Sequence, residues 1–371
     1  MKIGYSFWGF LADIKIRDGK EVSTPDGNAF YSWSIIFALL NAGHKVYRML
    51  PDRDREITAT KGINAFKSFA REKRQFAYHG LINEWPDDLD VLLMEWRFPI
   101  PGRNCNMAIS DPSYQPDLAI QYAMLAKYVN TKTKIIIFDL DYKITEEDEK
   151  SINPYCILET SNKPKDTYAK RIAIDIPFDF EEINTFGVRV ADSVKQLVYV
   201  GNRYERDRLI EKYLVPLTKI SQHRNQAATY TSPLNVHLYG NWLESGRDSQ
   251  IRWPNFIYHD RISMKDFRAA YGNSCATILL AKDEYLKSGF MTARILESIF
   301  FGTIPIGISE FYKIEKYLPE QLIISEPEEI IDIVNKSLFD YNWRVKMIHD
   351  LRGSLKIMDC RNFVKTIEEI I

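Results

Sequence analysis

Arg294 and Glu297 stand three residues apart in the segment from Lys282 to Ser309, KDEYLKSGFMTARILESIFFGTIPIGIS. On a helix, residues at this spacing lie on the same face. A guanidinium is a forked donor that suits phosphate oxygens, and a carboxylate can accept hydrogen bonds from both hydroxyls of a ribose. The pair therefore predicts a site for a nucleoside diphosphate, with an ordinary surface ion pair as the alternative.

The elements around this pair must place it where a ligand can reach it. The segment predicts a loop, a helix that begins near Phe290 or Thr292, a turn at Gly302 and a buried strand. Gly289 precedes the expected helix, whose free N–H groups and dipole would favour an anion. We therefore add Gly289 and Thr292 to the predicted ligand site.

Short apolar runs alternate with helical patterns along the whole chain, which is typical of parallel sheets with crossover helices. The expected strands are KIGYSFW, KVYRML, VLLMEW, TKIIIFDLD, QLVYVG, NVHLYG, CATILLA and TIPIGIS. The stretch RIAIDIPFDFEEIN lies between the fourth and fifth of these and suits an interdomain linker near residues 175 to 195. A chain of 371 residues is also long enough for two domains of ordinary size.

We therefore expect an α/β fold of two doubly wound, Rossmann-like domains, at residues 1–180 and 195–345. A C-terminal helix at about 350–371 is expected to pack back on the first domain. Sheets of this class bind ligands beyond the carboxyl ends of their strands, so the active site is expected in a cleft between the two domains.

The segment around Arg294 resembles the donor-binding region of GT-B glycosyltransferases, and within them the bacteriophage DNA beta-glucosyltransferases, which glucosylate 5-hydroxymethylcytosine. In that family an apolar strand and an Asp-Lys-x-Tyr loop precede an Ile-Thr-Leu-Arg-x-x-Glu stretch, much as ATILLAKDEY and MTARILES do here. The GTIP turn also resembles the phage alpha-glucosyltransferases. The resemblance implies that Arg294 binds the diphosphate of a UDP-sugar, that Glu297 binds its ribose and that Tyr285 lies beside it.

A thinner likeness extends over most of the chain. YVGNRYERDR resembles the family's Gly-Gly-Ser-Phe-Arg-x-x-x-Arg diphosphate loop, although the arginine spacing differs and Arg206 alone aligns well. VHLYGN resembles the family's Phe-Phe-Gly-Asn, near the uracil, and TPDGNAFYSW resembles its early donor and sugar loop. Asn28 stands where the family has a glutamate, so the sugar stays open, with UDP-glucose as the expected donor. The further donor-binding residues that the likeness implies are Gly27, Asn28, Gly201, Arg203, Arg206, Tyr239 and Gly240, with Arg208 a weaker candidate.

Two aspartates end the run TKIIIFDLD, and an ungapped match places Asp141 at the family's catalytic aspartate. A carboxylate at the end of a central strand can take the proton of an attacking hydroxyl, so Asp141 is the predicted general base of an inverting transfer. Asp139 is the alternative, and one of the two would otherwise cap the following turn. Asp139-Leu140-Asp141 also spells the D-x-D of a different, single-domain glycosyltransferase fold, which leaves a divalent cation possible.

The expected acceptor side lies in the first half of the chain. Trp96 and Arg97 end a predicted strand and are candidates to line the acceptor site. In KGINAFKSFAREKR basic residues outnumber the one acidic residue and alternate with aromatics, which predicts DNA contacts at Lys73 and Arg74. A solvated helix face is the alternative interpretation of that stretch.

The composition limits the partners. With 49 Lys+Arg against 50 Asp+Glu the net charge is −1, so the chain as a whole is not expected to bind polyanions constitutively. The 4 cysteines are far apart and the 6 histidines show no ligand spacing, so no metal site and no disulfide are predicted. Without a signal-peptide pattern we expect a cytoplasmic monomer with no membrane partner, in the host cytoplasm if a phage encodes it.

The leading hypothesis is transfer of a sugar from a UDP-sugar to a 5-hydroxymethylpyrimidine in double-stranded phage DNA. A GT-B transferase for a glycan, lipid-linked or small-molecule acceptor is the second hypothesis. A non-catalytic module that binds a nucleotide sugar is the third, and the acidic strand end together with Arg294 and Glu297 argues against it.

Overall fold

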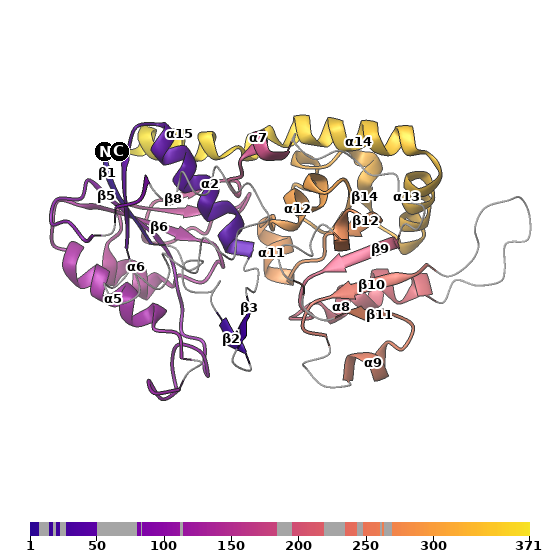
Figure 1. Ribbon diagram of the computed structural model, residues 1–371, viewed down its shortest axis with the longest axis horizontal. Coiled ribbons are helices and arrows are strands. Elements are labelled where there is room, and N and C mark those ends of the chain that lie inside the picture. The colour runs from indigo at the N-terminus through magenta and orange to yellow at the C-terminus, as the bar shows by residue number, and fades with distance from the viewer. Residues whose placement is uncertain are drawn as a thin grey trace, which may run out of the picture. The chain divides into compact units, whose positions relative to one another are not determined.

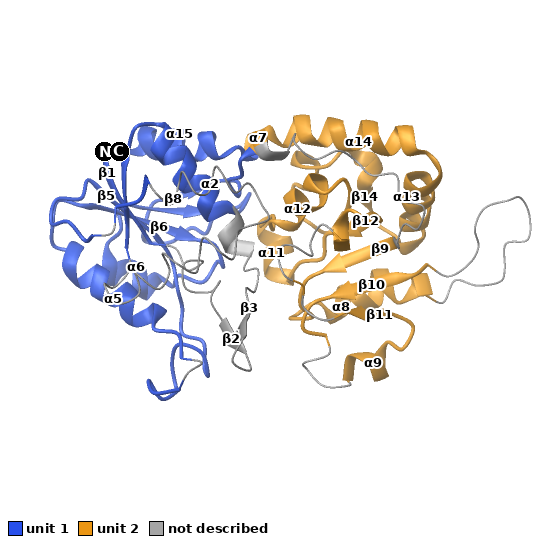
Figure 2. Ribbon diagram, viewed as in Figure 1, with its two compact units in different colours: residues 1–179, 358–371 blue, residues 180–357 orange. Residues whose placement is uncertain are grey.

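Two parallel six-stranded sheets form the framework of the computed structural model (Figure 1). The residues that it describes are 1–6, 15–17, 20–22, 27–49, 80–82, 84–111, 114–183, 195–218, 234–242, 248–259, 262 and 269–371. The chain divides into unit 1, Met1–Asp179 with Met358–Ile371, and unit 2, Phe180–Ile357 (Figure 2). This is an α/β fold in which each unit carries its own doubly wound sheet.

The sheet of unit 1 has the strand order β4-β1-β5-β6-β7-β8, and all five neighbouring pairs are parallel. Its strands are β1 (Lys2–Ser6), β4 (Lys45–Arg48), β5 (Val91–Glu95), β6 (Lys134–Asp139), β7 (Cys156–Glu159) and β8 (Arg171–Ala173). A separate antiparallel ribbon joins β2 (Lys15–Arg17) to β3 (Lys20–Val22).

Helices cover both faces of this sheet (Figure 1). They are α2 (Gly27–Asn41), α5 (Asp117–Tyr128), α6 (Glu146–Ile152) and α15 (Cys360–Ile370). Because side chains alternate along a strand, neighbouring residues of β6 face opposite ways. Phe138 packs against Tyr31 of α2 and Phe363 of α15, whereas Ile137 lies in a core cluster with Met124 of α5.

The C-terminal residues divide between the units. Helix α14 (Tyr341–Ser354) packs on elements of unit 2, and α15 packs against α2 in unit 1. The expected helix at about 350–371 is therefore two helices, with the change of unit between Ile357 and Met358. His44 Nε2 contacts Glu368 Oε1 at 2.9 Å, which ties α15 to the loop that follows α2.

The sheet of unit 2 has the order β11-β10-β9-β12-β13-β14, again with parallel neighbours. Its strands are β9 (Lys195–Val200), β10 (Val236–Tyr239), β11 (Ile257–His259), β12 (Ser274–Ile278), β13 (Ile304–Ile308) and β14 (Ile323–Ile324). The α-helices assigned here besides α14 are α7 (Phe180–Ile183), α8 (Asp207–Leu209), α9 (Asp248–Arg252), α11 (Asp283–Ser288), α12 (Arg294–Phe300) and α13 (Pro327–Phe339). Helix α12 packs on β13, and α13 packs on β12.

All eight apolar runs predicted as strands contain strands. The internal strand β7 and the edge strands β8, β11 and β14 were missed because they have only two to four residues. Two expectations were wrong. The stretch RIAIDIPFDFEEIN, predicted to contain the linker near residues 175 to 195 and no strand, begins with strand β8 (Arg171–Ala173). The segment after β12 begins with a short helix, α11, whose left-handed C-cap is Gly289, and the next helix begins at Arg294 instead of near Phe290 or Thr292.

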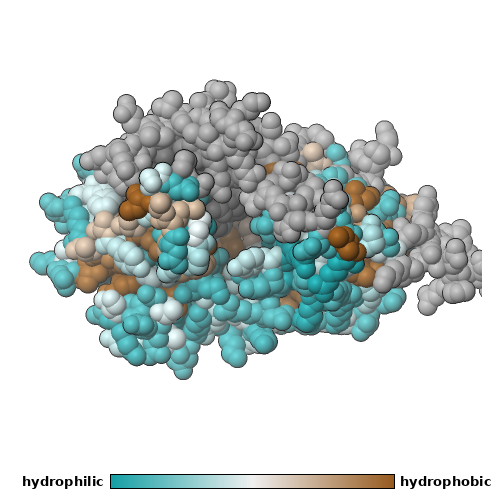
Figure 3. Space-filling view, turned by 90° about the horizontal axis from the view of Figure 1, so that it is seen from below, coloured by the Kyte–Doolittle hydropathy of each residue, from teal (hydrophilic) through white to brown (hydrophobic). Residues whose placement is uncertain are grey.

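On the face seen in Figure 3, the described surface is mostly hydrophilic, with small separate hydrophobic areas. Isolated apolar side chains of this kind are ordinary on a protein surface. Among the described residues, no helix combines the length and the apolar character that crossing a membrane requires.

Candidate functional site

The strand order of unit 2 identifies where its sheet can hold a ligand. From β9 the chain runs outward to β10 and β11, and then returns to form β12 on the other side of β9. The connections after β9 and β12 therefore leave the sheet in opposite directions, and ligands of such sheets bind at that switch point, beyond the carboxyl ends of the strands. In this chain the switch point lies at Gly201, after β9, and at Leu280, after β12.

Two glycines let the backbone approach closely there. A Cβ atom on Gly201 would lie 2.8 Å from both the Tyr199 hydroxyl and Arg294 Nη2. A Cβ atom on Gly240, at the end of β10, would collide with the carbonyl oxygen of Gly201. Both residues also have positive φ angles, 158° and 147°, that L side chains rarely adopt. A side chain at Gly240 would push the two loops apart, and one at Gly201 would displace the Arg294 guanidinium or the Tyr199 hydroxyl.

Arg294 connects the two strands of the switch point. Its Nε donates to the Val200 carbonyl oxygen at 2.8 Å, and its Nη1 donates to the Leu280 carbonyl oxygen at 3.2 Å. Nη1 also lies 3.3 Å from Thr292 Oγ1. The guanidinium carbon is 5.3 Å from the centre of the Tyr199 ring. These contacts hold the guanidinium at the carboxyl ends of β9 and β12.

A second arginine lies at the same strand ends. Arg206 is 6% exposed, and it donates to the carbonyl oxygens of Tyr204 at 2.6 Å and Leu280 at 3.4 Å. Burial lowers the pKa of Arg206 from its ordinary value, and the neighbouring charge of Arg294 lowers it further. Two guanidinium groups therefore share one largely buried region.

Glu297 follows Arg294 by one helical turn, as its spacing predicted. It is 6% exposed and accepts a hydrogen bond from the Tyr271 hydroxyl at 3.1 Å. Burial raises the pKa of Glu297, while Arg294 and the Tyr271 bond act in the opposite sense. Among the described residues of this cluster, Glu297 is a buried carboxylate beside Arg294. One carboxylate against two guanidinium groups leaves positive charge that an anion would offset.

Aromatic side chains and a lysine border the cluster. Tyr285 is buried and stacks on Phe290, with ring centres 4.3 Å apart. The Lys282 ammonium lies over the rings of Tyr204 at 4.6 Å and Tyr285 at 5.4 Å, where the negative ring faces attract it. Lys282 was not assigned a role from the sequence, although its place directly after β12 was visible there.

Arg203 and Tyr239 have other neighbours. Arg203 forms an ion pair with Asp207, with Nε 2.8 Å from Oδ1, and its Nη1 lies 3.3 Å from Ser249 Oγ. Tyr239 stacks on His259, with ring centres 4.1 Å apart. Arg203 thus contacts Asp207 of α8 and Ser249 of α9, and its donor-binding role stays a prediction.

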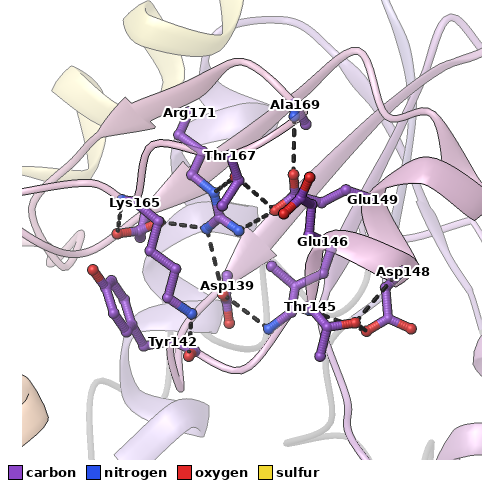
Figure 4. Close-up of polar contacts among 12 residues, drawn as sticks. Asp139, Tyr142, Thr145, Glu146, Asp148, Glu149, Lys165, Thr167, Ala169 and Arg171 are labelled. Atoms are coloured by element: carbon purple, nitrogen blue, oxygen red, sulfur yellow. Dashed lines mark hydrogen bonds and ion pairs between the residues drawn. The ribbon is translucent and has the colours of Figure 1, made fainter.

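In unit 1, the two aspartates at the end of β6 have different environments (Figure 4). Asp139 is 0% exposed, and its carboxylate accepts hydrogen bonds from the backbone N–H groups of Lys143 at 2.9 Å and Ile144 at 3.2 Å. The interpretation that one aspartate caps the following turn is confirmed for Asp139. Burial raises its pKa to about 6, against the lowering effect of those two hydrogen bonds. Asp141 lies within the capped turn and is half-buried.

A buried ion network supports this turn. Arg171 pairs with Glu149 and Glu159, and its Nη1 lies 3.8 Å from Asp139 Oδ2. Figure 4 shows the side chains of Asp139, Glu149 and Arg171 converging from β6, α6 and β8. Lys165 Nζ donates to the Tyr142 carbonyl oxygen at 2.7 Å, inside the turn, and Tyr142 has a left-handed φ of 61°. The turn that carries Asp141 is thereby fixed on both sides.

The structure describes only some of the remaining predicted site residues of unit 1. Lys73 and Arg74 lie outside the described residues. Gly27 and Asn28 are the first two residues of α2. Trp96 belongs to the hydrophobic core cluster, and Arg97 is buried with its backbone N–H on Gln121 Oε1 at 2.8 Å. The acceptor roles predicted for Trp96 and Arg97 are untested, and neither side chain offers much exposed surface.

The sequence predicted no metal site. The D-x-D alternative required Asp139 and Asp141 to bind a divalent cation together. The Asp139 carboxylate is occupied by two backbone N–H groups and lies beside Arg171. Within the described ranges, no three His, Cys, Asp or Glu side chains group as metal ligands would. The single-domain fold that the D-x-D alternative required is excluded by the two separate sheets.

Known proteins resemble this chain in structure, but comparisons of sequence find no match. No protein-family model matches the chain, and no curated protein matches its sequence. The beta-glucosyltransferase of phage T4 has a TM-score of 0.60 at 14% identity, covering 99% of both chains. An alpha-glucosyltransferase in complex with UDP and a 13-mer DNA has a TM-score of 0.59 at 11% identity, covering 100% of this chain and 99% of the other.

A third similar structure, the lipopolysaccharide outer core galactosyltransferase WaaB, has a TM-score of 0.50 at 12% identity, with 100% of both chains covered. A further structure of the phage T4 enzyme holds its UDP-glucose substrate. Together with the two doubly wound sheets, these likenesses show that the chain has the GT-B fold, as its resemblance to GT-B glycosyltransferases implied.

Proposed function

We propose that this chain is a glycosyltransferase that takes its sugar from a UDP-sugar, UDP-glucose first among them. The observation that carries the proposal is the pair of arginines, the half-buried Arg294 and the buried Arg206, at the switch point of the sheet in unit 2. Guanidinium groups in a low-dielectric setting are strong donors to phosphate oxygens. The UDP and UDP-glucose held by similar structures support uridine as the nucleoside.

The donor site is proposed to work by charge. Breaking the bond between the sugar and the diphosphate leaves its electron pair, and one more negative charge, on UDP. Arg294 is held by two backbone carbonyls, so its guanidinium is in place before the reaction and needs little reorganisation. Glu297, one turn along α12, is proposed to accept hydrogen bonds from the ribose hydroxyls.

Asp141 is proposed to act as the general base of an inverting transfer. It would take the proton of the acceptor hydroxyl as that oxygen forms a bond to the anomeric carbon and the bond to the diphosphate breaks. Asp139 is the weaker candidate, because its two carboxylate oxygens already accept backbone N–H groups. We assign Asp139 the task of positioning the turn that carries Asp141.

For the acceptor, we propose a 5-hydroxymethylpyrimidine in double-stranded DNA, modified on behalf of a phage. Support comes from the two structures with the higher TM-scores reported above, one from phage T4 and one in complex with DNA. A glycan, lipid-linked or small-molecule acceptor is the second candidate. The net charge of −1 and the likeness to a lipopolysaccharide galactosyltransferase favour it.

One experiment separates these candidates. The protein is incubated with a panel of nucleotide sugars and with either hydroxymethylated or unmodified DNA, and the nucleosides are digested and weighed by mass spectrometry. A hexose added to hydroxymethylated DNA alone, and lost in Asp141→Asn, is the expected result. UDP binding without transfer to DNA would move the proposal to the second acceptor class. Absence of UDP binding would overturn the donor assignment itself.

A further inference from the structure

Tyr199, in strand β9, carries a buried hydroxyl without a partner. Its side chain is 0% exposed, and among the described residues no atom forms a hydrogen bond with its hydroxyl. Buried polar groups in folded proteins nearly always have such a partner, so an exception calls for a physical reason. A ligand that supplies the missing partner is one such reason.

The position of the hydroxyl points to that ligand. A Cβ atom added to Gly201 would lie 2.8 Å from the Tyr199 hydroxyl and 2.9 Å from Arg294 Nε, so both groups lie beside the bare face of the same glycine. The Arg294 guanidinium carbon is 5.3 Å from the centre of the Tyr199 ring. The hydroxyl is therefore part of the switch point, beside the group that we propose to bind a phosphate.

The backbone carbonyl oxygens of the two residues that follow Tyr199 already accept hydrogen bonds. The Gly201 carbonyl oxygen accepts the indole N–H of Trp242 at 2.8 Å, and the Trp242 ring packs edge-on against Tyr199 with centres 6.0 Å apart. The Val200 carbonyl oxygen accepts from Arg294 Nε. A phenol hydroxyl can donate one hydrogen bond, and the nearby arginines can only donate. The acceptor that this hydroxyl needs is thus best supplied by an anion held between it and Arg294.

We propose that the Tyr199 hydroxyl is an uncharged third donor of the diphosphate site and binds a phosphate oxygen of the nucleotide together with Arg294 and Arg206. This inference rests on the proposed function and adds a binding residue to it. The resemblance assigned no role to Tyr199, although the stretch YVGNRYERDR begins with it. The hydroxyl adds a directed hydrogen bond without more positive charge, which suits a region where two guanidinium groups already repel each other.

The test compares Tyr199→Phe with the wild type by calorimetry, using UDP and uridine as ligands. The variant removes one oxygen and keeps the ring that packs on Trp242. We expect UDP to bind about 10- to 100-fold more weakly, as is typical for the loss of a hydrogen bond to a charged group. Uridine, which lacks phosphate, should bind as it does to the wild type. The melting temperature should stay the same or rise, because a buried hydroxyl without a protein partner disappears.

Thr277→Val is the matched control. Thr277, in β12, also has a buried hydroxyl without a partner among the described residues. In the sheet register Thr277 pairs with Val198, whose side chain is on the opposite face from that of Tyr199. The same loss of a buried hydroxyl at this position should leave UDP affinity unchanged.

The outcomes separate this inference from the proposed function. Wild-type UDP affinity in Tyr199→Phe, alongside a loss in Arg294→Ala, would overturn the inference and leave the donor site standing. A drop in uridine affinity as large as the drop for UDP, or an equal drop in Thr277→Val, would show a structural effect and also overturn it. If neither Tyr199→Phe nor Arg294→Ala changed UDP affinity, the proposed function would fail as well.

Discussion

At the scale of single residues, the proposed donor site depends on an imbalance of charge between two guanidinium groups and one buried carboxylate. Arg294 and Arg206 share the ends of β9 and β12, and Glu297 is a buried carboxylate beside Arg294. Arg294 already donates to two backbone carbonyls, so it is held in place without an anion. Removing its guanidinium should therefore affect the ligand more than a flexible surface arginine would.

We predict that Arg294→Ala weakens UDP binding by roughly 2 to 4 kcal/mol, because a half-buried charged donor to the diphosphate is lost. Glu297→Gln should have a smaller effect, since an amide oxygen can still accept from a ribose hydroxyl. Isothermal calorimetry of both variants measures this. Arg352→Ala is the control, because Arg352 also donates to backbone carbonyls, those of Ile299 and Phe300, and has no proposed part in binding the donor. Unchanged affinity in Arg294→Ala would show that the diphosphate binds elsewhere.

Asp141 is the residue on which the proposed chemistry depends. Asp141→Asn keeps the size of the side chain and loses the ability to accept a proton, so kcat should fall by about two to four orders of magnitude. Donor affinity should hardly change, because the variant leaves unit 2 untouched. Rates under saturating donor and acceptor, together with UDP calorimetry, check both statements. Near-normal turnover would remove Asp141 from the mechanism and favour a retaining reaction or another base.

At the scale of elements, the turn after β6 is positioned by partners distant in sequence. The carboxylate of Asp139 closes the turn through Lys143 and Ile144, and Arg171 of β8 lies behind it. Both carboxylate oxygens of Asp139 already accept hydrogen bonds from backbone N–H groups. Asp139 and Asp141 therefore cannot serve the same role, although they are only two residues apart. The network makes the geometry of the turn depend on the ionisation of a buried carboxyl group.

The pH dependence of stability should report this ionisation. Because burial raises the pKa of Asp139 from 3.8 to about 6, the folded protein binds a proton there more readily than the unfolded chain does. Its contribution to stability is complete below about pH 3.8 and is lost as pH rises through about 6. The wild type should therefore lose up to roughly 3 kcal/mol relative to Asp139→Asn between pH 4 and pH 7.

Urea unfolding of the two proteins at several pH values measures this difference. The variant cannot titrate at position 139, so it serves as the reference for every other group in the chain. Parallel stability curves for the two proteins across this range would mean that Asp139 keeps an ordinary pKa in the fold.

At the scale of the whole molecule, the near-balance of charge constrains how DNA could bind. With a net charge of −1, attraction to phosphates must come from a local cluster of basic residues and not from the chain as a whole. Phosphate contacts release counterions, so binding that depends on them weakens as salt rises. A target base must also leave the stack before its hydroxymethyl group can react.

If DNA is the acceptor, its apparent KM should rise steeply with salt, and Lys73→Glu with Arg74→Glu should raise it further at fixed salt. UDP affinity should not change in either case. Lys346→Glu is a suitable control, since Lys346 is an exposed residue of α14 outside the basic stretch. Steady-state rates with hydroxymethylated DNA across a salt series give the answer. Insensitivity to salt and to both substitutions would favour the glycan, lipid-linked or small-molecule acceptor.

The sequence by itself determined the class of fold and located the centre of the proposed donor site, because both depend on local patterns. Apolar runs located eight strands, and the spacing of Arg294 and Glu297 predicted their common helix face, since three residues make most of one helical turn. The resemblance to GT-B enzymes added Arg206, which the structure places beside Arg294 at the carbonyl of Leu280.

Only the tertiary structure decided which groups meet across long separations. Tyr271 reaches Glu297 over 26 residues, Arg171 lies beside Asp139 over 32, and the guanidinium of Arg294 in α12 lies 5.3 Å from the centre of the Tyr199 ring in β9. Strand order and register bring these groups together, and neither can be read from spacing along the chain. For the same reason, the sequence could name Asp139 and Asp141 as a pair, but the roles that separate them depend on which backbone N–H groups the fold brings to each carboxylate.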